Sequence, residues 1–166
     1  MHLCKHLLLA VCAAATLSSA HAQGATFQTV SLTPETALRA AQAAQAHCRA
    51  QGFQVTIAVV DRAGLTQVLL RDRFAGPHTV EVAADKAWTA VSFRHSTTVL
   101  AHESQPGKPM GGMRSQPRFM AVGGGMMIEA GGRILGAIGV SGGPSGDADD
   151  TCAKAGIAAI ADALEF

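Results

Sequence analysis

Two pairs of strand-like segments, each joined by a three-residue turn, constrain the fold of this 166-residue chain more than any other feature. The first pair is 55–61 (VTIAVVD) and 65–71 (LTQVLLR), and the second is 119–129 (FMAVGGGMMIE) and 133–141 (RILGAIGVS). Apolar runs of this length predict buried strands, and turns this short are typical of β-hairpins. We therefore predict an antiparallel sheet with helices packed against it, which is the α+β class.

Helical patterns precede and follow the two hairpins. Thr33, Pro34 and Glu35 form a helix start, and Gly52 supplies the matching helix end. A last helix is predicted over residues 147–165. The predicted buried stripe of the first helix consists of Leu38, Ala41, Ala44 or Gln45, and Cys48.

A central helix is predicted between the hairpins, beginning at Gly76-Pro77 and breaking near residues 94–97. Ser96 or Thr97 then caps a short helix that runs through His102. The alanine-rich stripe indicates that this helix packs closely on the sheet, and Lys86 and Thr89 lie away from it. The stripe consists of Val80, Ala83, Ala84, Ala87 and Val91.

The region between this helix and the second hairpin is irregular. Residues 103–117 hold three prolines and three glycines, which predicts a long loop, and long loops are usually functional or mobile. Gly123-Gly124-Gly125 falls inside the predicted strand 119–129. This run indicates either a β-bulge or a backbone that another group approaches closely.

The N-terminal residues have the pattern of an export signal. Residues 1–22 combine a weakly basic start at Lys5, an apolar run over 7–17, and an A-x-A cleavage site at Ala20-His21-Ala22. We predict a signal peptide over 1–22, a linker over 23–32 and one domain over 33–166. Cleavage near Ala22 would leave a periplasmic or secreted protein.

Charge and hydropathy argue against two classes of function. Removing residues 1–22 removes Lys5 and no acidic residue, which leaves 12 basic and 12 acidic residues. A chain without net charge, and without a basic tract interleaved with aromatic residues, gives no support for nucleic-acid binding. A second long apolar segment is absent from the sequence, so we expect no membrane span.

Cys48 and Cys152 are the cysteines that remain after the predicted cleavage. In an exported protein they could pair as a disulfide. Two cysteines in separate helices are more often small buried hydrophobic residues, so we favour that role and keep the disulfide as the alternative. The cysteine and histidine spacings do not indicate a zinc site.

His78 is the main candidate for coordinating a metal or haem iron. It lies beside Gly76-Pro77 at the start of the central helix, where the helix dipole favours the neutral imidazole. The neutral ring is the form that coordinates metals, so we predict His78 as a metal ligand. The alternative is that His78 only caps the helix.

Other residues could complete a ligand site around His78. Arg73, Lys86 and Arg114 could supply charges for the carboxylates of a ligand. Met110 and Met113 could contact a flat apolar ligand, or could close their loop on the core. We predict no catalytic residue among them.

Several motifs, taken in order, resemble those of the GlcG/HbpS family of small haem-binding proteins, which is related to the C-terminal domain of PduO. The resemblance covers residues 33–164, nearly the whole predicted mature chain. It is carried by Ile57-Ala58-Val59-Val60-Asp61 with Gly64, Arg71-Asp72, Ala84-Asp85-Lys86-Ala87 with Thr89-Ala90, Phe93, Thr97, Gly123-Gly124-Gly125, the segment 136–142 (GAIGVSG), Asp149-Asp150 and Ala155-Gly156.

This resemblance implies a profilin-like α-β-α sandwich, assembly into a homo-oligomer and haem as the cofactor. It also implies a threonine as one choice of haem ligand, corresponding to Thr97 or Thr98, whereas the residues themselves favour His78. We therefore expect an exported haem-binding protein. The alternatives are an oligomeric accessory protein that binds a small organic acid, and a haem- or corrinoid-processing enzyme. The predicted ligand site comprises His78, Arg73, Lys86, Thr97, Met110, Met113 and Arg114.

Overall fold

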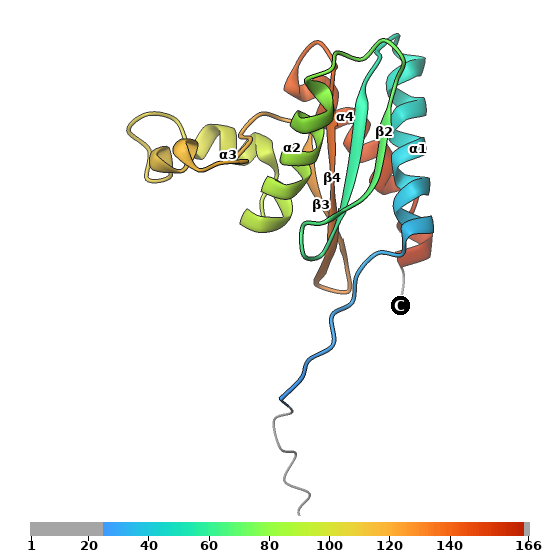
Figure 1. Ribbon diagram of the computed structural model, residues 1–166, viewed down its shortest axis with the longest axis horizontal. Coiled ribbons are helices and arrows are strands. Elements are labelled where there is room, and N and C mark those ends of the chain that lie inside the picture. The colour runs from blue at the N-terminus through green and yellow to red at the C-terminus, as the bar shows by residue number, and fades with distance from the viewer. Residues whose placement is uncertain (1–24, 165–166) are drawn as a thin grey trace, which may run out of the picture.

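A four-stranded antiparallel sheet forms the middle layer of the computed structural model, which describes residues 25–164 (Figure 1). The strands are β1 (Thr56–Asp61), β2 (Thr66–Arg71), β3 (Gly125–Ala130) and β4 (Arg133–Ser141), and they lie in the order β2-β1-β4-β3. Both predicted hairpins are confirmed, and pairing between β1 and β4 joins them into one sheet. The predicted signal peptide lies outside the described residues.

Helices cover both faces of this sheet. α1 (Pro34–Ala50) and α4 (Gly146–Ala158) pack on one face, and α2 (Thr79–Phe93) packs on the other (Figure 1). The α+β class and the α-β-α sandwich are therefore confirmed. A side chain at Gly139 of β4 would collide with the backbone carbonyl of Ala83, so the glycine allows α2 to lie close to the sheet.

Helix starts follow the predicted capping chemistry. Thr33 accepts a hydrogen bond from the Thr36 amide at 3.2 Å, and Pro34 occupies the first turn of α1. Ser96 caps the short helix α3 (Thr97–Glu103) in the same way. Gly52 follows α1 with a φ of +83°, which is the left-handed conformation favoured just after a helix.

Three predicted details of the helices are wrong. Leu38 was expected in the buried stripe of α1 but is 39% exposed, because Ala37 and Ala40 face the core instead. The last helix ends at Ala158, and a short 3₁₀ turn, η2 (Ala161–Leu164), replaces its final turn. Lys86 and Thr89 were expected away from the buried face of α2, yet both are buried.

Gly123 and Gly124 precede β3 and Gly125 begins it, and the predicted strand over 119–124 is wrong. Phe119 and Ala121 pack against Leu100 of α3, so the apolar pattern of this segment serves a cluster outside the sheet. The β-bulge is not observed at these glycines, but the close approach is. A side chain at Gly125 would meet the backbone carbonyl of Lys86 at 2.5 Å.

Residues 97–117 form an arm that projects from one side of the sandwich (Figure 1). The arm contains α3, a loop and the 3₁₀ helix η1 (Gly111–Ser115), so part of the predicted loop is helical. Leu100, Phe119 and Ala121 form its small core, with Met110 and Met113 packed against them. Among the helices in residues 25–164, none is long and apolar enough to cross a membrane.

Candidate functional site

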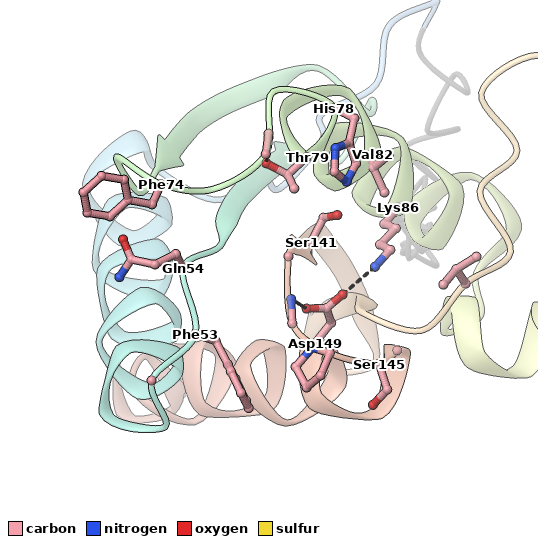
Figure 2. A pocket seen from close by; sticks show the side chains of 17 residues that line it. Phe53, Gln54, Phe74, His78, Thr79, Val82, Lys86, Ser141, Ser145 and Asp149 are labelled. Atoms are coloured by element: carbon pink, nitrogen blue, oxygen red, sulfur yellow. Dashed lines mark hydrogen bonds and ion pairs between the residues drawn. The ribbon is translucent and has the colours of Figure 1, made fainter.

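A pocket of about 670 Å³ opens where the N-terminus of α2 faces the loop between β4 and α4 (Figure 2). Its size falls within the range usual for small-molecule sites. Phe53 and Gln54, just after α1, form a third side. Val122 adds a fourth part, so the pocket is lined by four parts of the chain that are distant in sequence.

A buried ion pair forms the charged part of the pocket floor. The Nζ atom of Lys86 lies 2.8 Å from Oδ2 of Asp149 and donates a second hydrogen bond to the Val140 carbonyl at 2.9 Å. The Lys86 and Asp149 side chains are only 2% and 5% exposed. Because each charge neutralises the other, the floor carries hydrogen-bonding groups but no net charge.

Asp149 also holds the loop that borders the pocket. Its Oδ1 atom accepts a hydrogen bond from the Gly143 amide at 2.8 Å. A side chain at Gly143 would lie 2.7 Å from the same oxygen, so the glycine lets the loop approach the carboxylate. The carboxylate therefore ties the β4–α4 loop to α2 through Lys86.

Hydroxyl groups line the sheet side of the pocket. Thr79 donates to the Gly76 carbonyl at 2.6 Å and pairs with the hydroxyl of Thr56 at 2.7 Å, so Thr56 is the donor in that pair. Ser141, the last residue of β4, is 5% exposed, and its hydroxyl points into the pocket in Figure 2. Ser141 therefore offers a polar group to a bound ligand.

His78 stands exposed at the rim of the same pocket. It has helical backbone angles, and its side chain makes no capping hydrogen bond, so the predicted capping role is not observed. A side chain at Gly76 would lie 2.6 Å from Cε1 of the imidazole, so this glycine makes room for the ring. Phe74 and Val122 line the pocket nearby and are 79% and 48% exposed.

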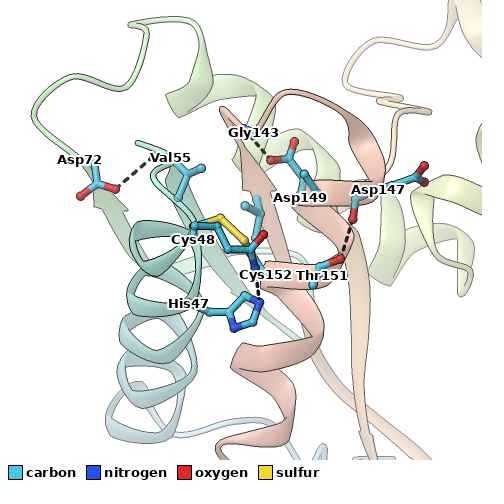
Figure 3. Close-up of a disulfide and its surroundings, with 12 residues drawn as sticks. His47, Cys48, Val55, Asp72, Gly143, Asp147, Asp149, Thr151 and Cys152 are labelled. Carbon is cyan, nitrogen blue, oxygen red and sulfur yellow. Dashed lines mark hydrogen bonds between the residues drawn. A yellow bond between two sulfur atoms is a disulfide. The ribbon is translucent and has the colours of Figure 1, made fainter.

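A disulfide between Cys48 and Cys152 fixes α4 against α1 (Figure 3). The two Cα atoms lie 5.6 Å apart, and the bond joins residues 104 positions apart in the sequence. The favoured prediction of two unpaired buried cysteines is therefore wrong, because the packing of α1 on α4 brings the two together. Asp149 lies one helical turn before Cys152, so the disulfide also stabilises the helix that carries the pocket carboxylate.

The predicted site residues divide into those that line this pocket and those that do not. His78 and Lys86 line the pocket together, whereas Arg73 is exposed in the loop before α2 and is not among the lining residues. Thr97 is buried, and its hydroxyl accepts a hydrogen bond from the Gly125 amide at 2.8 Å. Thr98 donates a hydrogen bond to Asp150. Both threonines therefore contribute to the contact of α3 with the sandwich.

The remaining predicted residues lie on the arm. Arg114 donates to the carbonyls of Ser104 at 2.6 Å and Ala101 at 3.2 Å, which closes the arm on itself. Met110 and Met113 pack in the arm core. Within one chain the structure does not bring these three residues to His78.

Sequence reasoning missed Asp149 and Ser141 as pocket residues. Asp149 was noted only as part of a motif, and a first-turn acid is ordinary at a helix N-terminus. The burial of Lys86 would have pointed to Asp149, since a buried lysine requires a counter-charge, but the helical pattern predicted Lys86 away from the buried stripe. Within residues 25–164, no group of three or more His, Cys, Asp or Glu side chains is placed to hold a metal ion.

Comparison with known proteins identifies the family of the chain. Residues 32–158 match the family model described as "Haem degrading protein HbpS-like". The chain belongs to the HbpS-like family. A double mutant of Streptomyces reticuli HbpS has a solved structure that is 39% identical, with a TM-score of 0.77 over 82% of this chain and 92% of that one.

Two further relatives connect this family with PduO. A structure described as a PduOC:heme complex is 32% identical, with a TM-score of 0.75 over 79% of this chain and 96% of that one. The corrinoid adenosyltransferase PduO of Citrobacter freundii is 38% identical over 116 residues, which is 68% of this chain and 34% of PduO. The chain thus spans about a third of that enzyme.

Proposed function

We propose that this protein is an exported haem-binding protein and that haem occupies the pocket beside His78. The observation that carries the proposal is an exposed imidazole, free of any capping bond, at the rim of a pocket of about 670 Å³ with aromatic and aliphatic walls. Haem combines a flat apolar ring with an iron that takes histidine as an axial ligand.

The residues present fit such a group. Phe53, Phe74 and Val82 would contact the ring, and His78 would coordinate the iron. Because Lys86 is already paired with Asp149, the floor presents no unbalanced charge to an apolar macrocycle. Bound haem would supply a redox-active iron, while the protein would hold and orient it and limit access of water.

The relatives support haem as the ligand. PduOC has been solved as a haem complex, and the family description names haem. These relatives share the whole α-β-α sandwich with this chain, since the family match covers residues 32–158. Arg73, Thr97, Met110, Met113 and Arg114 remain predictions as ligand contacts, and they lie outside the lining of this pocket.

Export is supported by two independent features. Residues 1–22 have the pattern of a signal peptide, and the Cys48–Cys152 disulfide suits an oxidising compartment. The proposed location is the periplasm or the extracellular space. The processed protein, recovered from the periplasm or the culture medium of its producing cells, should begin at Gln23 when its N-terminus is sequenced.

Assembly into a homo-oligomer is also part of the proposal. The arm of residues 97–117 projects from one side of the sandwich in Figure 1, and Val99 on its first helix is 46% exposed. An apolar residue on a projecting arm suits contact with a second copy of the chain. Mass measurement in solution tests this part by itself.

A haem titration followed at the Soret band tests the ligand and the site together. Wild-type protein should show saturable binding, and His78→Ala should lose or shift the band. His95→Ala is the matched control, because His95 is exposed at the far end of α2. Absence of saturable binding would overturn the function, whereas binding unchanged in His78→Ala would overturn His78 as the ligand.

A further inference from the structure

Three arginines meet at a second pocket, at the end of the sandwich opposite His78. This pocket has a volume of about 560 Å³ and is lined by Arg62, Arg94 and Arg133, with residues 27–30 closing one side. Arg62 lies in the turn between β1 and β2, Arg94 follows α2, and Arg133 begins β4. Each of three separate elements therefore places a positively charged arginine at this pocket.

These three charges have no counter-ion within the part of the chain that the structure describes. The other arginines near carboxylates are paired, as Arg118 is with Asp85 and Arg49 with Asp72. No Asp or Glu is among the described residues that line the second pocket. Three like charges around one cavity create a positive local potential that favours binding of an anion.

Asp61 and Glu129, which lie next to pocket residues in sequence or in strand register, form no ion pair with an arginine in the described chain. Asp61, next to Arg62, accepts the amides of Ala63 and Leu65 at 2.8 and 2.9 Å and holds the turn. Glu129 pairs in register with Ile134 on the neighbouring strand and makes no ion pair with an arginine in the described chain. The positive charge of the pocket therefore remains available to a ligand.

Arg94 occupies an unusual backbone position for its residue type. Its φ of 57° is the left-handed conformation in which glycine is favoured at a helix end. The conformation turns the chain out of α2 and places the arginine at the pocket. Replacement by glycine would suit the backbone and remove only the side chain, which makes Arg94→Gly an informative variant.

The pocket also has an apolar side. Phe27 and Val30 are 89% and 41% exposed, and Ile134 lies beside them. Guanidinium groups bind carboxylates and phosphates through paired hydrogen bonds, and an aromatic side chain favours an apolar ligand body. The described residues that line this pocket include no histidine, so the site differs from the proposed haem pocket in chemistry as well as position.

We propose that this second pocket binds a small anion that carries a carboxylate or phosphate on an apolar body. The test uses naphthyl phosphate and naphthoate as probes in calorimetric titrations of the haem-free protein, with naphthalenemethanol as the neutral probe. Both anions should bind saturably and more weakly at high salt. The neutral probe should bind at least about tenfold more weakly, because charged hydrogen bonds stabilise the anions.

Variants separate this site from the haem pocket. Arg94→Gly and Arg133→Gln should each weaken anion binding by about tenfold, since each removes a charged hydrogen-bond donor. Arg94→Gly should do so without lowering the melting temperature, which shows that the effect is not unfolding. Arg39→Gln is the matched control, because Arg39 is exposed on α1, and His78→Ala should also bind the anions normally.

Three results would overturn the proposal. One is the absence of saturable binding of either anionic probe. Another is equal binding of the anions and naphthalenemethanol, which would show that the arginines add nothing. The third is anion binding that persists in Arg94→Gly and Arg133→Gln but is lost in His78→Ala, which would place the probe in the other pocket.

Discussion

The His78 pocket and the arm of residues 97–117 are built in opposite ways. The pocket floor joins Lys86 to Asp149 across 63 positions of sequence, and the nearby disulfide spans 104. Thr97 and Thr98 attach the arm to the sandwich at the start of α3. Beyond that point the arm is held by contacts within itself, such as Arg114 to Ser104 across ten positions. Long-range contacts create the cavity of the first region, whereas short-range contacts shape the outer part of the second.

This difference explains why some of the predicted ligand contacts lie in the pocket and others lie on the arm. Met110, Met113 and Arg114 suggested ligand contacts in the sequence, yet their side chains are used to pack and close the arm. Lys86 lies at the pocket floor, where it pairs with Asp149, a residue distant from it in the sequence. A reactive residue type indicates a site only when the fold brings a second group to it.

The largest effect should come from breaking the buried ion pair. Lys86→Met leaves Asp149 buried without a counter-charge, which should lower the free energy of unfolding by about 3–5 kcal/mol. Chemical denaturation measures this change. The double variant Lys86→Met/Asp149→Leu should recover much of the loss, and a loss below about 1 kcal/mol in the single variant would contradict the pairing.

The disulfide should have the next largest effect. Replacing Cys48 and Cys152 with alanine should lower stability by about 2–4 kcal/mol, because the unfolded chain gains conformational freedom. Thermal unfolding of this variant should match that of the wild-type protein under reducing conditions. If reductant leaves the wild-type melting temperature unchanged, the two cysteines are not paired.

A smaller and local effect is expected on the arm. Arg114→Met removes two hydrogen bonds to backbone carbonyls and should lower local stability by about 1 kcal/mol. Hydrogen exchange should become faster in residues 97–117 and stay unchanged in β1 and β4. Faster exchange throughout the sheet would show that the arm and the sandwich unfold together.

The smallest effect concerns an exposed pair at the end of α3. A hydrogen bond from His102, and then the charge of Lys108, hold the pKa of Glu103 below its usual value of 4.5. A lowered carboxylate pKa adds stability above the pKa of the unfolded chain, and this stability is lost as the pH falls through the folded-state pKa.

His102→Ala should therefore raise the pKa of Glu103, as followed by NMR titration of its carboxylate. The accompanying change in global stability should be too small to detect, because the pair is exposed and screened by solvent. A pKa that does not move in this variant would show that the histidine is not its partner.

The sequence predicted the parts of the fold that depend on neighbouring residues. β4 runs from Arg133 to Ser141, as its pattern indicated, and Thr33 and Ser96 cap their helices. Short turns and caps are decided within a few residues, so their signals are local. His78 at the start of α2 followed from the same kind of signal.

The remaining features depend on contacts between distant segments. The apolar run before β3 could equally have been a strand, and only the position of Leu100 makes it part of the arm core. The disulfide requires α1 beside α4, and the pocket requires Asp149 beside Lys86. Neither neighbour can be assigned from residue type and spacing along the chain.

The most direct test is to locate haem on the folded protein. Ferric haem is paramagnetic and broadens the NMR signals of nearby residues, so a titration of isotope-labelled protein maps its position. Broadening should concentrate at Val82, Val122 and Gly143, which line the pocket beside His78. Broadening confined to Met110 and Met113 on the arm, with the pocket signals unchanged, would contradict the proposed site.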